Sequence, residues 1–237
     1  GNLGNGTGVL SLTPVKVTGI TTANAISVGN DNSCAMLANK TIRCWGRGNN
    51  GQLGDGSTTT QYVPASAVSG ITNASSVSAS FSHSCALLDN GSIKCWGMNY
   101  RGELGDGNHR SYSPQPTPVT VAGISNARMI STVGSLGPGD SSGVSCSLLA
   151  DSTIKCWGYD YNGQLGSGAR NTTSYTCGSS TCTDYYSITP VSVNGISTAS
   201  VIESGQSSYS SHTCAIVDNG SIKCWGSNGS GQLGGGS

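Results

Sequence analysis

Apolar and polar positions follow one pattern at four places along the chain. In each place, two short runs rich in apolar and β-branched residues flank a polar centre, which predicts two strands joined by a tight turn. In two copies the centre is Asp-Asn-Gly, where Gly91 and Gly220 can adopt the positive φ that closes a three-residue hairpin loop. Lys40 and Ser152 take that position in the other copies, at some conformational cost. The four segments are "SCAMLANKTIRCWG" at 33–46, "SCALLDNGSIKCWG" at 84–97, "SCSLLADSTIKCWG" at 145–158 and "TCAIVDNGSIKCWG" at 213–226.

Two further motifs accompany each hairpin. A Pro-x-x-Val-type segment ending in Gly-Ile precedes it, and a Gly-x-Leu-Gly motif follows it. The first occurs as "PVKVTGI" at 14, "PASAVSGI" at 64, "PVTVAGI" at 118 and "PVSVNGI" at 190. The second occurs as "GQLGDG" at 51, "GELGDG" at 102, "GQLGSG" at 163 and "GQLGGG" at 231, and the chain opens on a fifth copy, "GNLGNG". Each unit therefore predicts four strands: the Pro-Val segment, an apolar stretch such as "AISVG", and the two hairpin strands.

These units predict an all-β fold, a β-propeller built of four-stranded antiparallel blades. A four-stranded unit cannot bury both faces alone, so copies must stack on one another. We expect a single repeat domain over residues 1–237. Its units are approximately 1–50, 51–101, 102–162 and 163–230, with 231–237 starting a further unit.

The spacing of the cysteines within each hairpin predicts disulfides. If residues 89–91 form the loop, Leu88 pairs with Ser92, and Cys85 lies opposite Cys95 at a close, non-hydrogen-bonded position. The same count joins Cys34 to Cys44, Cys146 to Cys156 and Cys214 to Cys224, and Cys177 with Cys182 can staple an insertion. Because such bonds persist in oxidising surroundings, we expect a secreted, periplasmic or cell-surface protein.

Composition and charge argue against several classes of function. Only 9% of residues are charged, 11 basic against 11 acidic, which disfavours nucleic-acid binding. No apolar run is long enough to span a bilayer, and no signal peptide opens the chain, as expected of a mature product. The cysteine spacing does not suit zinc, and no nucleophile, carboxylate pair or metal cluster converges. We therefore expect no enzyme activity, no metal site and no cofactor.

The segment "HSCALLDNGSIKCWGMNYRGELGDG", with the following Pro-x-x-Val-x-Gly-Ile, resembles the regulator of chromosome condensation repeat family in its bacterial, cysteine-bearing secreted form. The resemblance covers almost the whole chain. It implies a β-propeller, commonly of seven blades, built for protein contact. The founding member exchanges nucleotide on a nuclear GTPase, a role that does not suit disulfide-bearing hairpins. A secreted bacterial relative inhibits β-lactamases through one propeller face, which is an analogy of fold.

The number of repeats departs from the family pattern. There are four Cys-Trp-Gly units where seven are usual, and five Gly-x-Leu-Gly motifs where a ring of four needs four. Three arrangements follow: a small closed ring, part of a longer array, or an open stack whose ends meet neighbouring subunits. The last would propagate head to tail into a filament.

The loops of variable length identify a candidate binding face. The loops after the second and fourth strands of a unit emerge at the same end of a blade, and all nine tyrosines lie in them. Tyrosine and arginine are favoured at protein interfaces. The four tryptophans and His83 and His212 recur at equivalent positions, so we interpret them as structural. The candidate face comprises Tyr100, Arg101, Arg110, Tyr112, Tyr159, Tyr161, Arg170, Tyr175, Tyr185, Tyr186 and Tyr209.

Together these features predict a secreted or cell-surface, non-enzymatic propeller. It would bind a protein partner or its own copies, in the second case assembling head to tail into extracellular filaments. The alternative is a glycan-binding propeller that uses repeated aromatic pockets. The filament form requires oligomers of the native protein, and the glycan-binding alternative requires binding to carbohydrate.

Overall fold

The computed structural model describes residues 1–108, 113–134, 143–177, 180–205 and 211–235, and of residues 174–177, 180–182 and 219 it describes the backbone alone. The described residues form four antiparallel sheets. Blade 1 contains β1 (Ala23–Val28), β2 (Asn32–Leu37) and β3 (Ile42–Gly46); blade 2 contains β4 (Ala74–Ala79), β5 (His83–Leu88), β6 (Ile93–Gly97) and β7 (Gln115–Thr120). Blade 3 contains β8 (Ala127–Val133), β9 (Val144–Leu149), β10 (Ile154–Tyr159), β11 (Thr172–Cys177) and β12 (Ser180–Ser192); blade 4 contains β13 (Val201–Gly205), β14 (His212–Ile216) and β15 (Ile222–Gly226), with a 3-10 turn at Asp218–Gly220.

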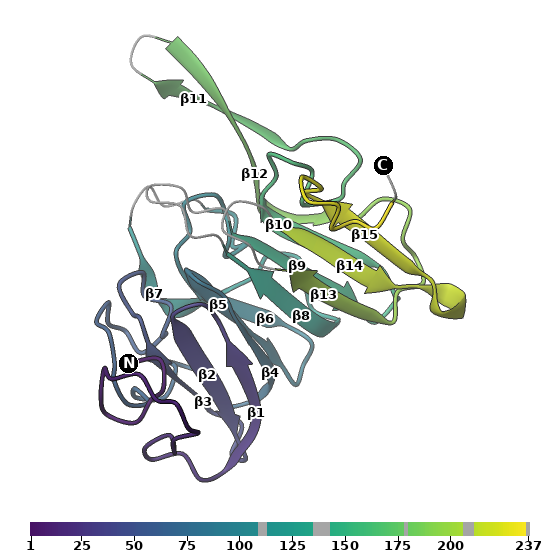
Figure 1. Cartoon of the computed structure of the whole chain (residues 1–237). Helices are drawn as coiled ribbons and strands as arrows, with labels where there is room; N and C mark the ends of the chain where they lie inside the picture. Colours follow the sequence, from purple (N-terminus) through teal and green to yellow (C-terminus); the bar gives the residue numbers. More distant parts are fainter. Residues whose placement is uncertain (109–112, 135–142, 178–179, 206–210, 236–237) are drawn as a thin grey trace.

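The blades form an open arc. Strands β1 and β2 contact β4, strands β4 and β5 contact β8, and strands β8 and β9 contact β13. Figure 1 shows blade 1 and blade 4 at opposite ends of this arc, with the β11–β12 hairpin projecting from blade 3. The structure therefore does not adopt the closed ring of four, which leaves part of a larger ring or an open stack from the three arrangements.

The hairpins have the register that the cysteine spacing predicts. Cys85 lies opposite Cys95, with 4.0 Å between the α-carbons, and the two form a disulfide. Three more of the predicted pairs are confirmed, namely Cys34–Cys44, Cys146–Cys156 and Cys214–Cys224. The side chains of Cys177 and Cys182 lie outside the described part of the chain. Closing loops of this length contributes on the order of 2 to 3 kcal/mol each in the chain-entropy picture.

The predicted order of strands within a unit is wrong in one respect. The Pro-Val segment does not begin the blade that follows it but completes the preceding one: β7 pairs with β6, and β12 pairs with β10. In blade 1 the same role falls to residues 61–68, because Val68 N–H donates to the carbonyl of Ile42 at 2.8 Å. The segment is rich in proline, which lacks an N–H group, so the outer edge of a sheet is where it fits.

The apolar core lies between the blades. Each tryptophan of a Cys-Trp-Gly triplet donates its indole N–H to a backbone carbonyl in the preceding Gly-x-Leu-Gly loop, as Trp96 does to Gln52 at 2.9 Å. Gly54 of that loop has φ of 73°, and a Cβ there would lie 2.7 Å from the Trp96 indole nitrogen. The glycine is required both by its backbone conformation and by this close approach. The loop thus holds each blade against the next.

The hairpin loops provide a test of local strain. Ser152 has φ of 65°, where its repeat counterpart Gly91 has φ of 76°. Replacing Ser152 with Gly should raise the free energy of unfolding by about 1 kcal/mol, because glycine adopts this conformation without steric cost.

The matched change, Gly91→Ala, should lower the free energy of unfolding by at least a similar amount. Besides the strained φ, its Cβ would lie 2.7 Å from the carbonyl oxygen of Ser125. Urea unfolding of the oxidised protein measures both effects. Equal stability of the two variants would contradict this account of the loops.

Candidate interaction surfaces

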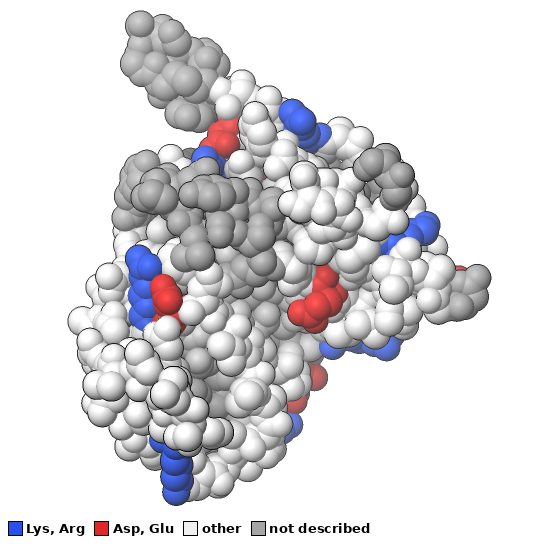
Figure 2. Space-filling model, in the orientation of Figure 1, with Lys and Arg blue, Asp and Glu red and all other residues white. Residues whose placement is uncertain are grey.

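Part of the predicted binding face gathers into one group, here called the tyrosine–arginine cluster. Its residues come from the loop after β6, from β10 and the loop that follows it, and from β12. Figure 2 shows that charged side chains are sparse on the face of the molecule drawn there. The cluster itself combines aromatic rings with two guanidinium groups. The cluster comprises Tyr100, Arg101, Tyr159, Tyr161, Arg170, Asp184 and Tyr185.

Arg101 is the structural centre of the cluster. Its Nε donates to Asp184 Oδ2 at 2.8 Å, and the two side chains are only 14% and 17% exposed. The guanidinium carbon lies 4.9 Å from the ring centroid of Tyr159. The ion pair between Arg101 and Asp184 ties the loop of blade 2 to strand β12 of blade 3. Since its guanidinium is already engaged inside the molecule, we interpret Arg101 as a positioning residue.

The exposed part of the cluster centres on Tyr161 and Arg170. Tyr161 is 49% exposed. Its ring packs edge-on against Tyr185, with 5.4 Å between centroids, and the guanidinium carbon of Arg170 lies 5.5 Å from both centroids. Such a rigid aromatic surface with a cation can bind a partner at low entropic cost.

The remaining predicted face residues divide into two groups. Tyr186 is buried, at 7% exposed, so it packs the blade instead of presenting a surface. Arg110, Tyr112 and Tyr209 lie outside the described residues, as does the side chain of Tyr175. The structure thus brings together Tyr100, Arg101, Tyr159, Tyr161, Arg170 and Tyr185.

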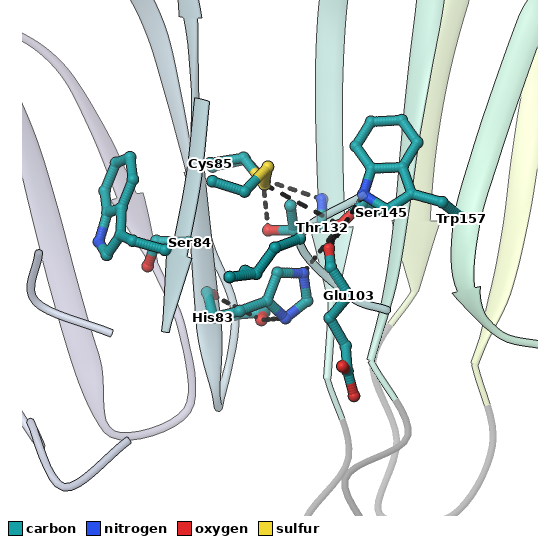
Figure 3. Close-up of a disulfide and its surroundings, with 12 residues drawn as sticks. His83, Ser84, Cys85, Glu103, Thr132, Ser145 and Trp157 are labelled. Carbon is teal, nitrogen blue, oxygen red and sulfur yellow. Dashed lines mark hydrogen bonds between the residues drawn. A yellow bond between two sulfur atoms is a disulfide. The ribbon is translucent and has the colours of Figure 1, made fainter. Parts of the chain in front are cut away.

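A buried polar network joins blades 2 and 3 (Figure 3). His83 Nδ1 lies 3.0 Å from Ser80 Oγ, and its Nε2 lies 2.9 Å from Ser145 Oγ. Ser145 Oγ donates to the backbone carbonyl of Glu103 at 3.0 Å. Burial lowers the pKa of His83 to about 3, so the ring is neutral at physiological pH. With no exposed surface on His83 or Ser145, this network links strands β5 and β9 and is structural.

Glu103 is an acid at a position that holds glutamine in three of the other four Gly-x-Leu-Gly motifs and asparagine in the first. Gln52 and Gln164 occupy the same place in other Gly-x-Leu-Gly loops, and each accepts a hydrogen bond from a backbone N–H two residues earlier. Glu103 Oε2 accepts the same bond from Arg101 N at 2.8 Å, whereas its Oε1 is buried without a partner. Desolvation raises the pKa of Glu103 from 4.5 to about 7.

The two ends of the arc form surfaces that sequence reasoning did not identify. On blade 1, apolar side chains line a hollow of about 310 Å³, here called the blade-1 hollow. On blade 4, Ile222 is 66% exposed. Both faces are built from positions that are mostly buried elsewhere in the repeat, and the local sequence of each exposed copy matches that of the buried ones. The hollow is lined by Val17, Ile20, Ala23, Ile26, Ser27, Val28, Ser33, Cys34, Ala35 and Trp45.

The described residues contain neither a metal-binding cluster nor a membrane-spanning helix. No group of three or more His, Cys, Asp or Glu side chains there could hold a metal ion. In the same part of the chain, no helix is long and apolar enough to cross a membrane.

Comparison with known proteins identifies the repeat. Models described as "Regulator of chromosome condensation (RCC1) repeat" match residues 24–52, 74–103 and 207–232, and residues 44–87. The ultraviolet-B receptor UVR8 of Arabidopsis thaliana is 32% identical over 146 residues, covering 60% of this chain and 31% of UVR8. The E3 ubiquitin-protein ligase HERC2 of Mus musculus is 25% identical over 207 residues, covering 86% of this chain and 4% of HERC2. The chain thus spans less than a third of the length of these relatives.

Solved structures show the same fold. Prp20p from Saccharomyces cerevisiae matches with a TM-score of 0.72 at 19% identity, over 90% of this chain and 48% of that chain. Human WBSCR16 matches with a TM-score of 0.68 at 19% identity, over 90% of this chain and 49% of that chain. The four blades therefore correspond to about half of each solved chain, in agreement with an arc.

Replacing Glu103 with Gln tests the cost of the buried acid. A carboxyl whose pKa is raised on folding stabilises the fold fully below its unfolded pKa, and this contribution is lost as pH rises through the folded pKa. The stability of E103Q relative to the parent should therefore increase from about pH 4.5 to about pH 7 and then level off. The slope should be on the order of 1 kcal/mol per pH unit.

The measurement is urea unfolding of both proteins at a series of pH values. The glutamine retains the acceptor for Arg101 N–H, as Gln52 and Gln164 do for their neighbours. Since other titrating groups are common to both proteins, the difference isolates residue 103. A difference that is independent of pH would contradict the raised pKa.

Proposed function

Because the chain belongs to the regulator of chromosome condensation (RCC1) repeat family, we propose that it is an extracellular, non-enzymatic module that joins copies of itself head to tail into filaments. The RCC1-like fold supports a role in protein interaction. Among the solved relatives, Prp20p is described with its binding to Gsp1p and histones, and yeast RCC1 is solved bound to Kap60. The observation that carries our proposal is the presence of two unlike apolar faces at the ends of the arc.

An extracellular location is supported by the disulfides. Four hairpins are each closed by one bond between directly opposed cysteines. In a reducing compartment these bonds would be opened by glutathione and thioredoxin, and the blades would lose their stabilisation.

Head-to-tail assembly is supported by the difference between the two ends. A contact between unlike surfaces leaves one of each surface open on the growing oligomer, so it propagates unless the rotation between copies closes a ring. Two identical faces would instead give a closed dimer. The surfaces on blades 1 and 4 are unlike, because one is a hollow and the other a projecting strand edge.

The tyrosine–arginine cluster is the surface that we propose for a further protein partner. Its exposed residues Tyr161 and Arg170 lie in the loop that follows β10, and neither of them lines the blade-1 hollow. A glycan-binding role has less support. Such a propeller needs repeated aromatic pockets, yet Trp96 and Trp157 are 0% exposed.

Assembly of the oxidised chain tests the proposed function. We expect gel filtration and electron microscopy to show oligomers whose mass is a multiple of one chain and grows with protein concentration. The control is the double variant Tyr161→Ser with Arg170→Ser, which should assemble like the parent because it alters the cluster alone. A monodisperse monomer throughout the micromolar range would overturn the proposal.

A further inference from the structure

The three interfaces between successive blades are built from the same repeat positions. One blade contributes its hairpin disulfide, an apolar residue of its second strand and an isoleucine that begins its third strand. The Pro-Val segment on the outer edge of that blade leads into the interface with its Val and Ile, and the next blade contributes residues of its first two strands and its tryptophan. The isoleucines, Ile42, Ile93 and Ile154, are each 0% exposed. The chain therefore contains three copies of one interface.

Blade 4 presents the first half of this interface without a covering blade. Ile222 occupies the position of Ile93 and Ile154, yet it is 66% exposed where they are 0% exposed. Ile216, the counterpart of Leu148, is 37% exposed. Among the described residues, β15 pairs only with β14, so its outer edge carries no fourth strand.

Blade 1 presents the second half. Ile26 is 71% exposed, whereas its repeat counterparts Val77 and Ile202 are 9% and 1% exposed. Together with Val17 and Ile20 it lines the blade-1 hollow, at the place where the preceding blade would pack. The residues that fill the equivalent place in blade 2 are Ile42, Met36 and the disulfide of blade 1.

The Pro-Val segments add hydrogen bonds to this interface. Val121 N–H donates to the carbonyl of Ile93, and Val193 N–H donates to the carbonyl of Ile154, both at 2.9 Å. Residues 14–17, "PVKV", form the corresponding segment at the start of the chain, but they do not belong to any sheet. Val17 is partly exposed there, whereas Val121 and Val193 are buried.

We propose that residues 14–17 of one copy complete blade 4 of a second copy as its fourth strand. In this joint, Val17 N–H donates to the carbonyl of Ile222, and Val15 lies opposite Cys224. The side chain of Ile222 then enters the blade-1 hollow beside Ile26. The inference rests on the proposed self-assembly and specifies its joint. Its occupant is a second copy because the chain itself holds both matching halves.

Two features of the joint differ from the internal interfaces. Lys16 lies opposite Lys223, where the internal pairs are Lys94 with Thr120 and Lys155 with Ser192. Like charges directly opposed weaken a sheet. In addition, the chain has a Gly-x-Leu-Gly loop at each end, at residues 1–6 and at residues 231–235. Trp45 of the same chain already donates its indole N–H to the carbonyl of Asn2 in the first of these loops, at 2.9 Å. Only one of the two loops can lie on Trp45 in the joint.

Directional assembly can be tested with two complementary variants. Ile222→Glu places a charge on the blade-4 face, and Ile26→Glu places a charge in the blade-1 hollow. Both side chains are mostly exposed in the single chain, so each variant should fold normally. Each variant alone should be a monomer. An equal mixture should give a heterodimer, because I222E keeps its intact blade 1 and I26E keeps its intact blade 4. Sedimentation velocity distinguishes these states.

Cysteine cross-linking tests the register. A chain with Lys16→Cys and a separate chain with Lys223→Cys should form an intermolecular disulfide on mixing, because residues at these positions are directly opposed in the internal sheets. Neither variant alone should form the head-to-tail product. Thr13→Cys, three residues out of register, is the matched control and should not cross-link to Lys223→Cys.

The opposed lysines provide a gain-of-function test. Lys16→Thr recreates the pair found between Lys94 and Thr120. It should lower the protein concentration at which oligomers form by up to about fivefold at low salt, and the advantage should shrink as salt is added.

The outcomes separate this joint from the proposed function. If the parent chain assembles but I222E and I26E assemble equally well alone, the joint is overturned while self-assembly stands. If the parent chain stays monomeric, both are overturned, and the faces belong to further blades or to another protein. If Thr13→Cys cross-links as well as Lys16→Cys, the register is overturned.

Discussion

The structure depends on one constraint, which is that a blade must bury both of its faces against neighbouring blades. A single four-stranded sheet of this composition has no second layer within itself. The apolar set that meets this need is small. It consists of an isoleucine, a disulfide, a tryptophan and the residues of a Pro-Val segment, repeated at each of three interfaces. Burying each isoleucine contributes about 1.5 to 3 kcal/mol.

The same constraint explains why the outer strand of a blade follows the Gly-x-Leu-Gly loop in the sequence and does not precede it. The loop first crosses to the next blade, where it receives the indole N–H of the tryptophan, and the chain then returns to add the Pro-Val strand. Two hydrogen bonds mark one such connection: the Trp96 indole N–H donates to the carbonyl of Gln52, and Val68 N–H donates to the carbonyl of Ile42. Each connection therefore belongs to two blades, which couples the stability of each blade to that of its neighbours.

An arc built in this way has a direction. The exposed face of blade 1 and the exposed face of blade 4 carry the repeat positions that form the two halves of one internal interface. Ile222 and Ile26 show this most clearly, since both exceed 60% exposure at positions that are buried inside the arc. The tyrosine–arginine cluster is built from blades 2 and 3, and none of its residues lines the blade-1 hollow. Binding a partner and joining copies can therefore occupy different surfaces.

Local features of the fold could be predicted from the sequence. The Asp-Asn-Gly turn fixes the hairpin register, and the register alone places Cys85 opposite Cys95, because both features depend on residues within one loop closure. Repetition likewise predicts the number of hairpins. The tyrosine cluster could be predicted only in part, because loop membership does not determine burial: Tyr161 is exposed and Tyr186 is not.

Other features depended on which surfaces meet in space. The sequence could not assign the Pro-Val segment to the preceding blade, since the pattern of four strands is the same whichever blade the segment joins. It could not exclude a closed ring of four, because closure depends on the angle between packed blades and not on the blades themselves. It also gave no sign that Ile222 is exposed, since the residue matches Ile93 in every local respect and differs only in lacking a neighbour. Hydrogen-bond pairing and turn chemistry are encoded locally, as in the Cys85–Cys95 hairpin, whose cysteines have a sequence separation of 10. Burial is decided by segments that lie far apart in the chain.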